Sequence, residues 1–266
     1  MIDLDLLKLQ AVKTGLGIKY LAKEERISLL LQQLHELFPK ESLVLKGGTA
    51  LNRGYLFASK KGRFSEDIDI DYQKHQGLNR KIQDISEIMK TIEDFTIGKP
   101  RLLHRTLRFD CQYVNQLTEK DRVQIEFYLS EKKEARPPKE ILLQSQYLPV
   151  SATLFSVYDF EELIAQKLVS LYRRMEGKDI YDLFYGLEVH VDLQQVFTSL
   201  STLFHHYHIT TEQNKFFYDL VQRLQNAETN ARYIGNATNH FIPKSLRPNW
   251  MVFIRGLQDK INQRFL

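Results

Sequence analysis

Two aspartates, Asp67 and Asp69, stand two residues apart in the alternating stretch Asp67–Tyr72. Residues two apart on a β-strand point to the same face, so we expect the two carboxylates to project side by side. Carboxylates that close repel each other, and a divalent cation relieves the repulsion. Mg²⁺ favours the oxygen atoms of carboxylates and phosphates. The pair therefore predicts a site for Mg²⁺, or for Mn²⁺ in its place.

A glycine pair, Gly47-Gly48, follows the short apolar run Ser42–Leu45, which we interpret as a buried strand. Glycines after a strand let a phosphate approach the backbone, and the start of the helix expected over residues 49–57 attracts anions. Taken alone, Asp-x-Asp is more often a solvated strand face and Gly-Gly a simple turn. Glycines for a triphosphate followed by aspartates for its metal indicate metal-assisted phosphoryl or nucleotidyl transfer.

The stretch LKGGTALNRGYLFASKKGRFSEDIDIDY, residues 45–72, closely resembles the signature of the AbiEii-like nucleotidyltransferase toxins. These belong to the DNA-polymerase-beta-like nucleotidyltransferase superfamily, which places a glycine turn before an Asp-x-Asp strand. The interval from Gly48 to Asp67 is longer than in compact members of the superfamily and matches the AbiEii branch. Arg63 and Ser65 supply the Arg-x-Ser-x-Asp-x-Asp string of that branch.

The resemblance continues downstream, to about residue 190. The family carries a helix lysine followed by an Arg-Asp or Lys-Asp pair at the start of the next helix, and Lys167 and Lys178-Asp179 match this pattern. The resemblance implies that Lys167 reaches nucleotide phosphates and that Asp179 pairs with it or orients it. Asp182, inside the same predicted helix, is a rival to Asp179, and we favour a structural contact for it.

The superfamily adds a third carboxylate from a later strand, and two residues qualify. The stretches Thr106–Val114 and Arg122–Leu129 alternate as strands and are joined by a polar segment, which predicts a hairpin. Glu126 lies on the polar face of the second strand and Asp110 on that of the first. We favour Glu126 because the family's third acid lies on a strand shortly before the helical half, and Asp110 remains the alternative. Asp71 is expected to be solvated.

The resemblance thus assigns metal binding and catalysis to Asp67, Asp69 and Glu126, with Lys167 and Asp179 completing the catalytic set. The residues expected to contact the nucleotide are Lys46, Gly47, Gly48, Thr49, Arg63, Ser65 and Lys167.

The remaining pattern predicts an α/β (α+β) fold in two parts. Domain 1–150 is a nucleotidyltransferase domain with a small mixed sheet and flanking helices, and domain 151–266 is helical. The nucleotide is expected between them. Asp159 is expected to cap the first helix of the second domain together with Glu162. Helices are predicted over residues 18–38, 78–92, 160–172, 178–187, 193–204, 211–224 and 250–265.

The composition is that of an ordinary globular protein. The chain has 266 residues, 43% of them hydrophobic, and a net charge of +4 that only weakly favours a polyanionic partner. No apolar run is long enough to span a membrane, and the first residues lack a secretory signal, so we expect a cytoplasmic protein. The one cysteine, Cys111, is expected in the core. The cluster of His205, His206 and His208 is expected to be a surface feature.

The expected activity is Mg²⁺-dependent transfer of a nucleoside monophosphate from an NTP to an acceptor, with release of pyrophosphate. By resemblance, the acceptor is RNA, such as the 3′ end of a tRNA. The chain is then the toxin of a toxin–antitoxin or phage-defence system, alongside an antitoxin protein encoded elsewhere. Two alternatives stay open: the same chemistry on a small molecule or a protein hydroxyl, and a non-catalytic nucleotide-binding protein.

Overall fold

The computed structural model describes residues 2–130 and 135–266, which form two compact units. The sheet unit comprises residues 2–60, 64–130 and 138–158. The helical unit comprises residues 61–63, 135–137 and 159–266. The short segment 61–63 therefore belongs with helices that follow it by about a hundred residues.

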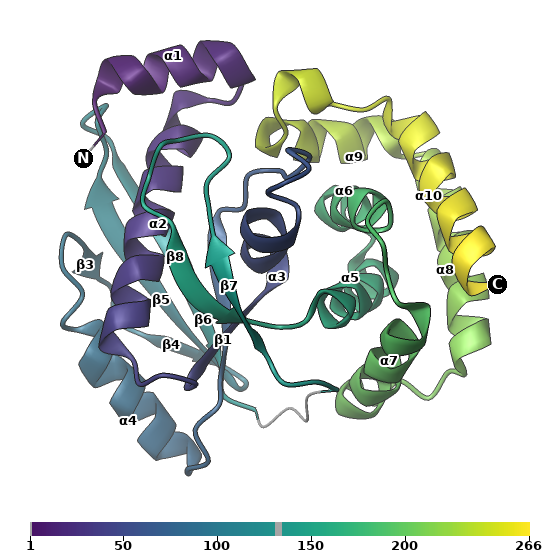
Figure 1. The fold of residues 1–266 in the computed structure, drawn as a ribbon, viewed down its shortest axis with the longest axis horizontal. Helices are drawn as coiled ribbons and strands as arrows, with labels where there is room; N and C mark the ends of the chain where they lie inside the picture. Colours follow the sequence, from purple (N-terminus) through teal and green to yellow (C-terminus); the bar gives the residue numbers. More distant parts are fainter. Residues whose placement is uncertain (1, 131–134) are drawn as a thin grey trace. The chain divides into compact units, whose positions relative to one another are not determined.

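The sheet unit is built on a mixed sheet that has eight strands within the described residues (Figure 1). Its order is β3-β5-β6-β2-β1-β8-β7, and β4 pairs with β5. The pairs β2–β6 and β1–β8 are parallel, and the others are antiparallel. The strands are β1 (Leu43–Lys46), β2 (Asp67–Tyr72), β3 (Thr96–Ile97), β4 (Arg101–Leu103), β5 (Thr106–Val114), β6 (Lys120–Tyr128), β7 (Lys139–Leu143) and β8 (Thr153–Val157).

One face of this sheet is apolar and covered. On β2, β6 and β5 the alternation places Ile68, Ile125 and Phe109 in the core, each at most 1% exposed. The long helix α2 (Ile18–Leu37) packs on β8 and β6 through a buried apolar stripe. The other helical segments of the unit are α1 (Leu4–Thr14), α3 (Gly47–Ala50), the π-helical turn η1 (Leu51–Tyr55) and α4 (Leu78–Met89).

The helical unit is held together by aromatic side chains. Phe253 stacks on Phe184 with ring centroids 3.9 Å apart, and Phe217 stacks on Phe265 at 4.5 Å. The helices are α5 (Phe160–Arg174), α6 (Gly177–Gly186), α7 (Leu193–Tyr207), α8 (Gln213–Glu228), α9 (Ala231–Thr238) and α10 (Trp250–Phe265), with 3₁₀ turns η2 (Asn239–Phe241) and η3 (Lys244–Leu246).

The predicted mixed α/β class is confirmed, and β2 and β5 begin and end where the alternation placed them. The sheet continues past residue 150, because β8 pairs in parallel with β1. The predicted side-chain cap at Asp159 is wrong: this residue precedes α5 without capping it, and its carboxylate accepts a hydrogen bond from Arg136 at 3.2 Å.

Three further placements bear on the sequence predictions. Cys111 is fully buried, as expected, and burial raises the pKa of its thiol to about 12. His205 and His208 lie exposed at the end of α7. None of the helices in the described residues has the length and apolar character that a membrane span requires.

Candidate active site

The glycine turn lies directly against one of the two aspartates. The chain passes from β1 into α3 without a loop, and Gly47 takes a left-handed backbone conformation with φ 72°. A Cβ atom at Gly47 would collide with the Asp69 carboxylate. Glycine is therefore required twice, for the backbone angle and for the close approach of Asp69.

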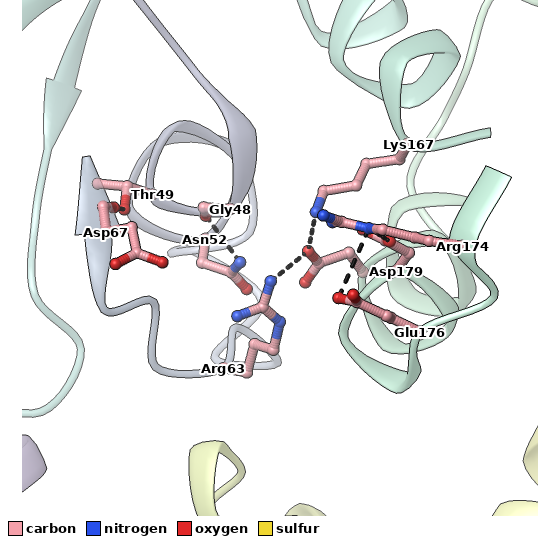
Figure 2. A network of polar contacts seen from close by, with 10 residues as sticks. Gly48, Thr49, Asn52, Arg63, Asp67, Lys167, Arg174, Glu176 and Asp179 are labelled. Carbon is pink, nitrogen blue, oxygen red and sulfur yellow. Dashed lines mark hydrogen bonds and ion pairs between the residues drawn. The ribbon is translucent and has the colours of Figure 1, made fainter. Parts of the chain in front are cut away.

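The helix that follows the turn is tied down on two sides. The Thr49 hydroxyl donates to the Asp67 carbonyl oxygen at 2.5 Å, and the Asn52 amide donates to the Gly48 carbonyl oxygen at 2.8 Å (Figure 2). In the π-helical turn, Arg53 is buried and forms an ion pair with Glu24 of α2 at 2.7 Å. The glycine turn is thus held to β2 at one end and, through η1, to α2 at the other.

Asp67 and Asp69 are half-buried on β2, in the middle of the sheet. The register sets Asp69 opposite Lys46 of β1 and opposite Glu126 of β6. Residues opposite one another on paired strands share a face of the sheet. Lys46, Asp69 and Glu126 therefore form one polar row across three strands.

The register also separates the two candidates for the third carboxylate. Asp110 lies on β5, one strand farther from Asp69 than Glu126, and its carboxylate accepts from Arg101 at 2.7 Å and from Arg122 at 3.3 Å. The Glu126 carboxylate accepts from Arg108, Gln124 and Tyr128 at 2.5–3.0 Å. Within the described residues, no three His, Cys, Asp or Glu side chains are gathered as metal ligands. The prediction that this site binds a metal ion therefore rests on the Asp67 and Asp69 carboxylates.

The prediction that Asp71 is solvated is wrong. Asp71 is 3% exposed, and its carboxylate forms an ion pair with Lys46 and accepts a hydrogen bond from the Tyr158 hydroxyl. The Lys46 ammonium also lies 3.3 Å from the centroid of the Tyr128 ring. Lys46, predicted to contact the nucleotide, is thus held between Asp71 and Tyr128 at the edge of the glycine turn.

In the helical unit, Lys167 of α5 contacts two aspartates of α6, of which Figure 2 labels Asp179. Its ammonium lies 2.9 Å from Asp179 and 2.8 Å from Asp182. Arg174 contacts Asp179 at 2.7 Å, and Arg63 of the segment 61–63 contacts Asp182 at 2.7 Å. Three cations thus alternate with two fully buried carboxylates, and we call these five residues the buried charge network.

The buried charge network fixes the protonation of its members. Burial alone would raise the pKa of Asp179, but Lys167 and Arg174 lower it to about 2. Burial likewise acts to raise the pKa of Asp182, while Arg63 and Lys167 lower it. Burial would lower the pKa of Lys167, yet the two carboxylates raise it above its ordinary value. All three groups are therefore charged near neutral pH.

The structure brings together Lys167 and Asp179, as the sequence predicted. It also places Asp182 and Arg174 in contact with them, and Arg63 in contact with Asp182. Asp182 was interpreted as structural, but it contacts Lys167 as closely as Asp179 does. Because Asp182 lies three residues after Asp179 on the same helix, the two side chains share a helix face, and this spacing could have predicted the second contact. Arg174 left no comparable signal. The roles in catalysis and nucleotide binding assigned to these residues, and to Ser65 on the half-buried segment before β2, stay predictions.

A known protein family matches most of this chain. The family described as "Nucleotidyl transferase AbiEii toxin, Type IV TA system" matches residues 29–263. Among solved structures, MenT4, a nucleotidyltransferase toxin from Mycobacterium tuberculosis, is 19% identical with a TM-score of 0.64 and covers 98% of this chain and 90% of its own.

JHP933 from Helicobacter pylori is 16% identical with a TM-score of 0.51, and the match covers 93% of this chain and 95% of that one. At these identities the two structures establish a shared fold. No curated protein matches the chain significantly. Because the family match spans most of the sequence, the chain belongs to the AbiEii family of nucleotidyltransferase toxins of type IV toxin–antitoxin systems.

Proposed function

We propose that this protein transfers a nucleoside monophosphate from an NTP to RNA, with the 3′ end of a tRNA as the expected acceptor, and releases pyrophosphate. One observation carries the proposal: Asp67 and Asp69 project from one face of β2 while the glycine turn packs on Asp69. A pair of carboxylates beside a backbone turn open to phosphates is the arrangement that nucleotidyl transfer requires.

The chemistry of these donors fits Mg²⁺, or Mn²⁺. Two like-charged carboxylates share a strand face, and hard oxygen ligands are those that Mg²⁺ favours. Asp67 and Asp69 would hold the ion, and the register makes Glu126 the third candidate ligand. When bound, the metal supplies positive charge to the triphosphate and lowers the pKa of the acceptor hydroxyl.

In this proposal, the residues of the glycine turn bind the phosphates of the NTP. The first helical N–H groups after β1 belong to Gly47, Gly48 and Thr49, and such groups attract anions. Lys46 adds a positive charge immediately before them, held in place by Asp71. We assign Arg63 and Ser65, which precede the Asp-x-Asp strand in the chain, to the same nucleotide.

Lys167 and Asp179 are assigned to the same reaction. The two buried aspartates keep the Lys167 ammonium charged and fix its position, as a phosphate-binding point charge requires. Asp179 acts through Lys167, so it is a positioning residue for the phosphates.

The test is to incubate the purified protein with each α-³²P-labelled NTP, Mg²⁺, and separate fractions of total RNA, protein and small molecules. The expected result is label in RNA of tRNA size, abolished by EDTA and restored by excess Mg²⁺ or Mn²⁺. Label only in the protein or small-molecule fraction would replace the RNA acceptor. A folded protein that labels none of the fractions would be a nucleotide-binding protein without turnover, and the proposal would fail.

A further inference from the structure

Arg26 of α2 is a buried cation that forms an ion pair with none of the acids in residues 2–130 and 135–266. It is 6% exposed, and its Nε atom is buried without a hydrogen-bond partner. The other two buried arginines, Arg53 and Arg63, each form an ion pair at 2.7 Å. No carboxylate in the described part of the chain lies within ion-pair distance of Arg26. An unpaired buried charge is costly, so a ligand that supplies a counter-charge would stabilise this position.

Two aromatic rings hold the Arg26 guanidinium without satisfying its donors. The guanidinium carbon lies 5.8 Å from the centroid of Phe95 and 5.4 Å from that of Tyr113. Contact with an aromatic ring uses the face of the guanidinium, whereas its N–H groups point outward in the plane. The two rings therefore position the group, and a ligand in the guanidinium plane could accept from its N–H donors.

Arg26 lines a cavity of about 470 Å³, a volume typical of small-molecule sites. The cavity is bordered by α2, by Asp94 and by the segment 149–151 that leads to β8. Its polar lining residues are Glu25, Arg26, Ser28, Gln32, Asp94 and Ser151. None of them belongs to the candidate active site.

The two acidic lining residues, Glu25 and Asp94, limit the charge of a ligand that the cavity can bind. The Glu25 carboxylate accepts from the Ile2 backbone N–H and from the Gln116 amide, each at 2.5 Å. Asp94 is exposed. Glu25 and Asp94 line the same cavity as Arg26, so the lining is not cationic overall, which disfavours a polyanion such as RNA or a triphosphate. A small oxyanion that accepts two parallel N–H bonds remains compatible, since Arg binds carboxylate and phosphate in this way.

We propose that this cavity is a binding site for a small oxyanion, a phosphate or a carboxylate, with Arg26 as its anchoring residue. The site is separate from nucleotidyl transfer. Occupation supplies the counter-charge that Arg26 lacks, so the anion stabilises the folded sheet unit.

The test measures thermal unfolding in inorganic phosphate, and separately in acetate, with KCl holding the ionic strength constant. The Tm of the wild type should rise to a plateau with at least one anion, and the effective anion identifies the ligand class. Arg26→Met should abolish this rise. It should also raise the Tm in anion-free buffer, because a buried unpaired charge is replaced by an apolar side chain of similar length.

Three further variants sharpen the result. Arg80→Met, which removes an exposed arginine on α4, and Asp69→Asn, at the candidate active site, should both keep the anion response. Arg26→Lys retains the charge without the planar fork, so it should raise the anion concentration needed for half of the Tm shift by about tenfold or more. This variant also provides a test if Arg26→Met does not fold. The proposal is overturned if neither anion stabilises the wild type, or if the Arg26 variants respond as the wild type does.

Discussion

At the scale of single residues, Gly47 and Asp69 constrain each other. Gly47→Ala introduces a side chain at φ 72° and a Cβ atom that collides with the Asp69 carboxylate. The substitution should cost about 1–2 kcal/mol of stability for the left-handed backbone. Because it also displaces a proposed metal ligand, nucleotidyl transfer should fall by about tenfold or more.

The matched control is Gly77→Ala. Gly77 has an ordinary φ of −60° before α4, and a Cβ atom there meets nothing within 4 Å. This variant should keep the wild-type rate and unfold within about 0.5 kcal/mol of the wild type. Equal activity of the two alanine variants would separate the glycine turn from the Asp69 carboxylate.

Lys167 should be the residue of the helical unit least tolerant of substitution. Lys167→Met leaves Asp179 and Asp182 buried with one cation fewer between them, which should cost about 3–5 kcal/mol in urea unfolding. Lys215→Met on α8 is the control, since Lys215 is 70% exposed and its ion pair with Asp219 is weak. A loss below about 1 kcal/mol at Lys167 would contradict the role given to the buried charge network.

Asp71 shows why some residues could not be interpreted from the sequence. On an alternating strand it has the same pattern as Asp67 and Asp69, yet it is buried by contacts with Lys46 and Tyr158. Tyr158 is 87 residues away in the chain, and no pattern near Asp71 predicts this contact. The Asp-x-Asp pair itself could be found, because its spacing and the preceding glycines are local features.

At the scale of elements, the strand register decides between Glu126 and Asp110. Glu126 lies directly opposite Asp69 on β6, whereas Asp110 lies on the next strand between two arginines. Glu126→Gln should therefore lower the rate by about tenfold or more and raise the Mg²⁺ concentration needed for half-maximal rate. Asp110→Asn should change both by less than about twofold. The reverse order of effects in steady-state labelling would make Asp110 the third carboxylate.

Elements with strong periodicity were predicted well, and those defined by pairing were not. β5 and β2 alternate along their whole length, and α10 repeats with helical spacing, so their bounds follow from the sequence. β7 and β8 were missed because their place in the sheet depends on pairing with β1. The sequence also did not predict the π-helical turn. It contains Arg53, whose ion-pair partner Glu24 lies on α2, far away in the sequence.

At the scale of the whole molecule, the stability of the helical unit should depend on pH. The folded-state pKa of Asp179 is about 2, below its ordinary 3.8, so this group stabilises the folded state above pH 3.8. That contribution, roughly 2 kcal/mol, is lost as the pH falls through about 2. Lys167 acts at the other end: its raised pKa gives stability that persists below pH 10.5 and is lost only above that value.

Trp250 makes the acid transition of one unit measurable. It is the single tryptophan of the sequence and is buried in α10 of the helical unit, so its fluorescence reports that unit. Asp179→Asn should destabilise the helical unit at neutral pH and reduce its stability change between pH 4 and 2, leaving the part that comes from Asp182. An unaltered pH dependence in the variant would show that Asp179 does not govern it.

The change to helical periodicity after residue 150 led to the predicted domains 1–150 and 151–266, and that division stays a prediction. The sequence did not predict that segment 61–63 belongs to the helical unit, where Arg63 contacts Asp182, 119 residues away. Arg63 precedes Asp67 by only four residues, so the motif assigned to the nucleotide from sequence spans both units.

The most direct test of the central claim is the initial rate at which purified tRNA is labelled from α-³²P NTP by Asp69→Asn, compared with the wild type. Asp84→Asn, on α4, is the control, and circular dichroism establishes that all three proteins are folded. The account predicts a loss on the order of a hundredfold or more for Asp69→Asn and a wild-type rate for Asp84→Asn. A folded Asp69→Asn protein that labels tRNA at the wild-type rate would contradict it.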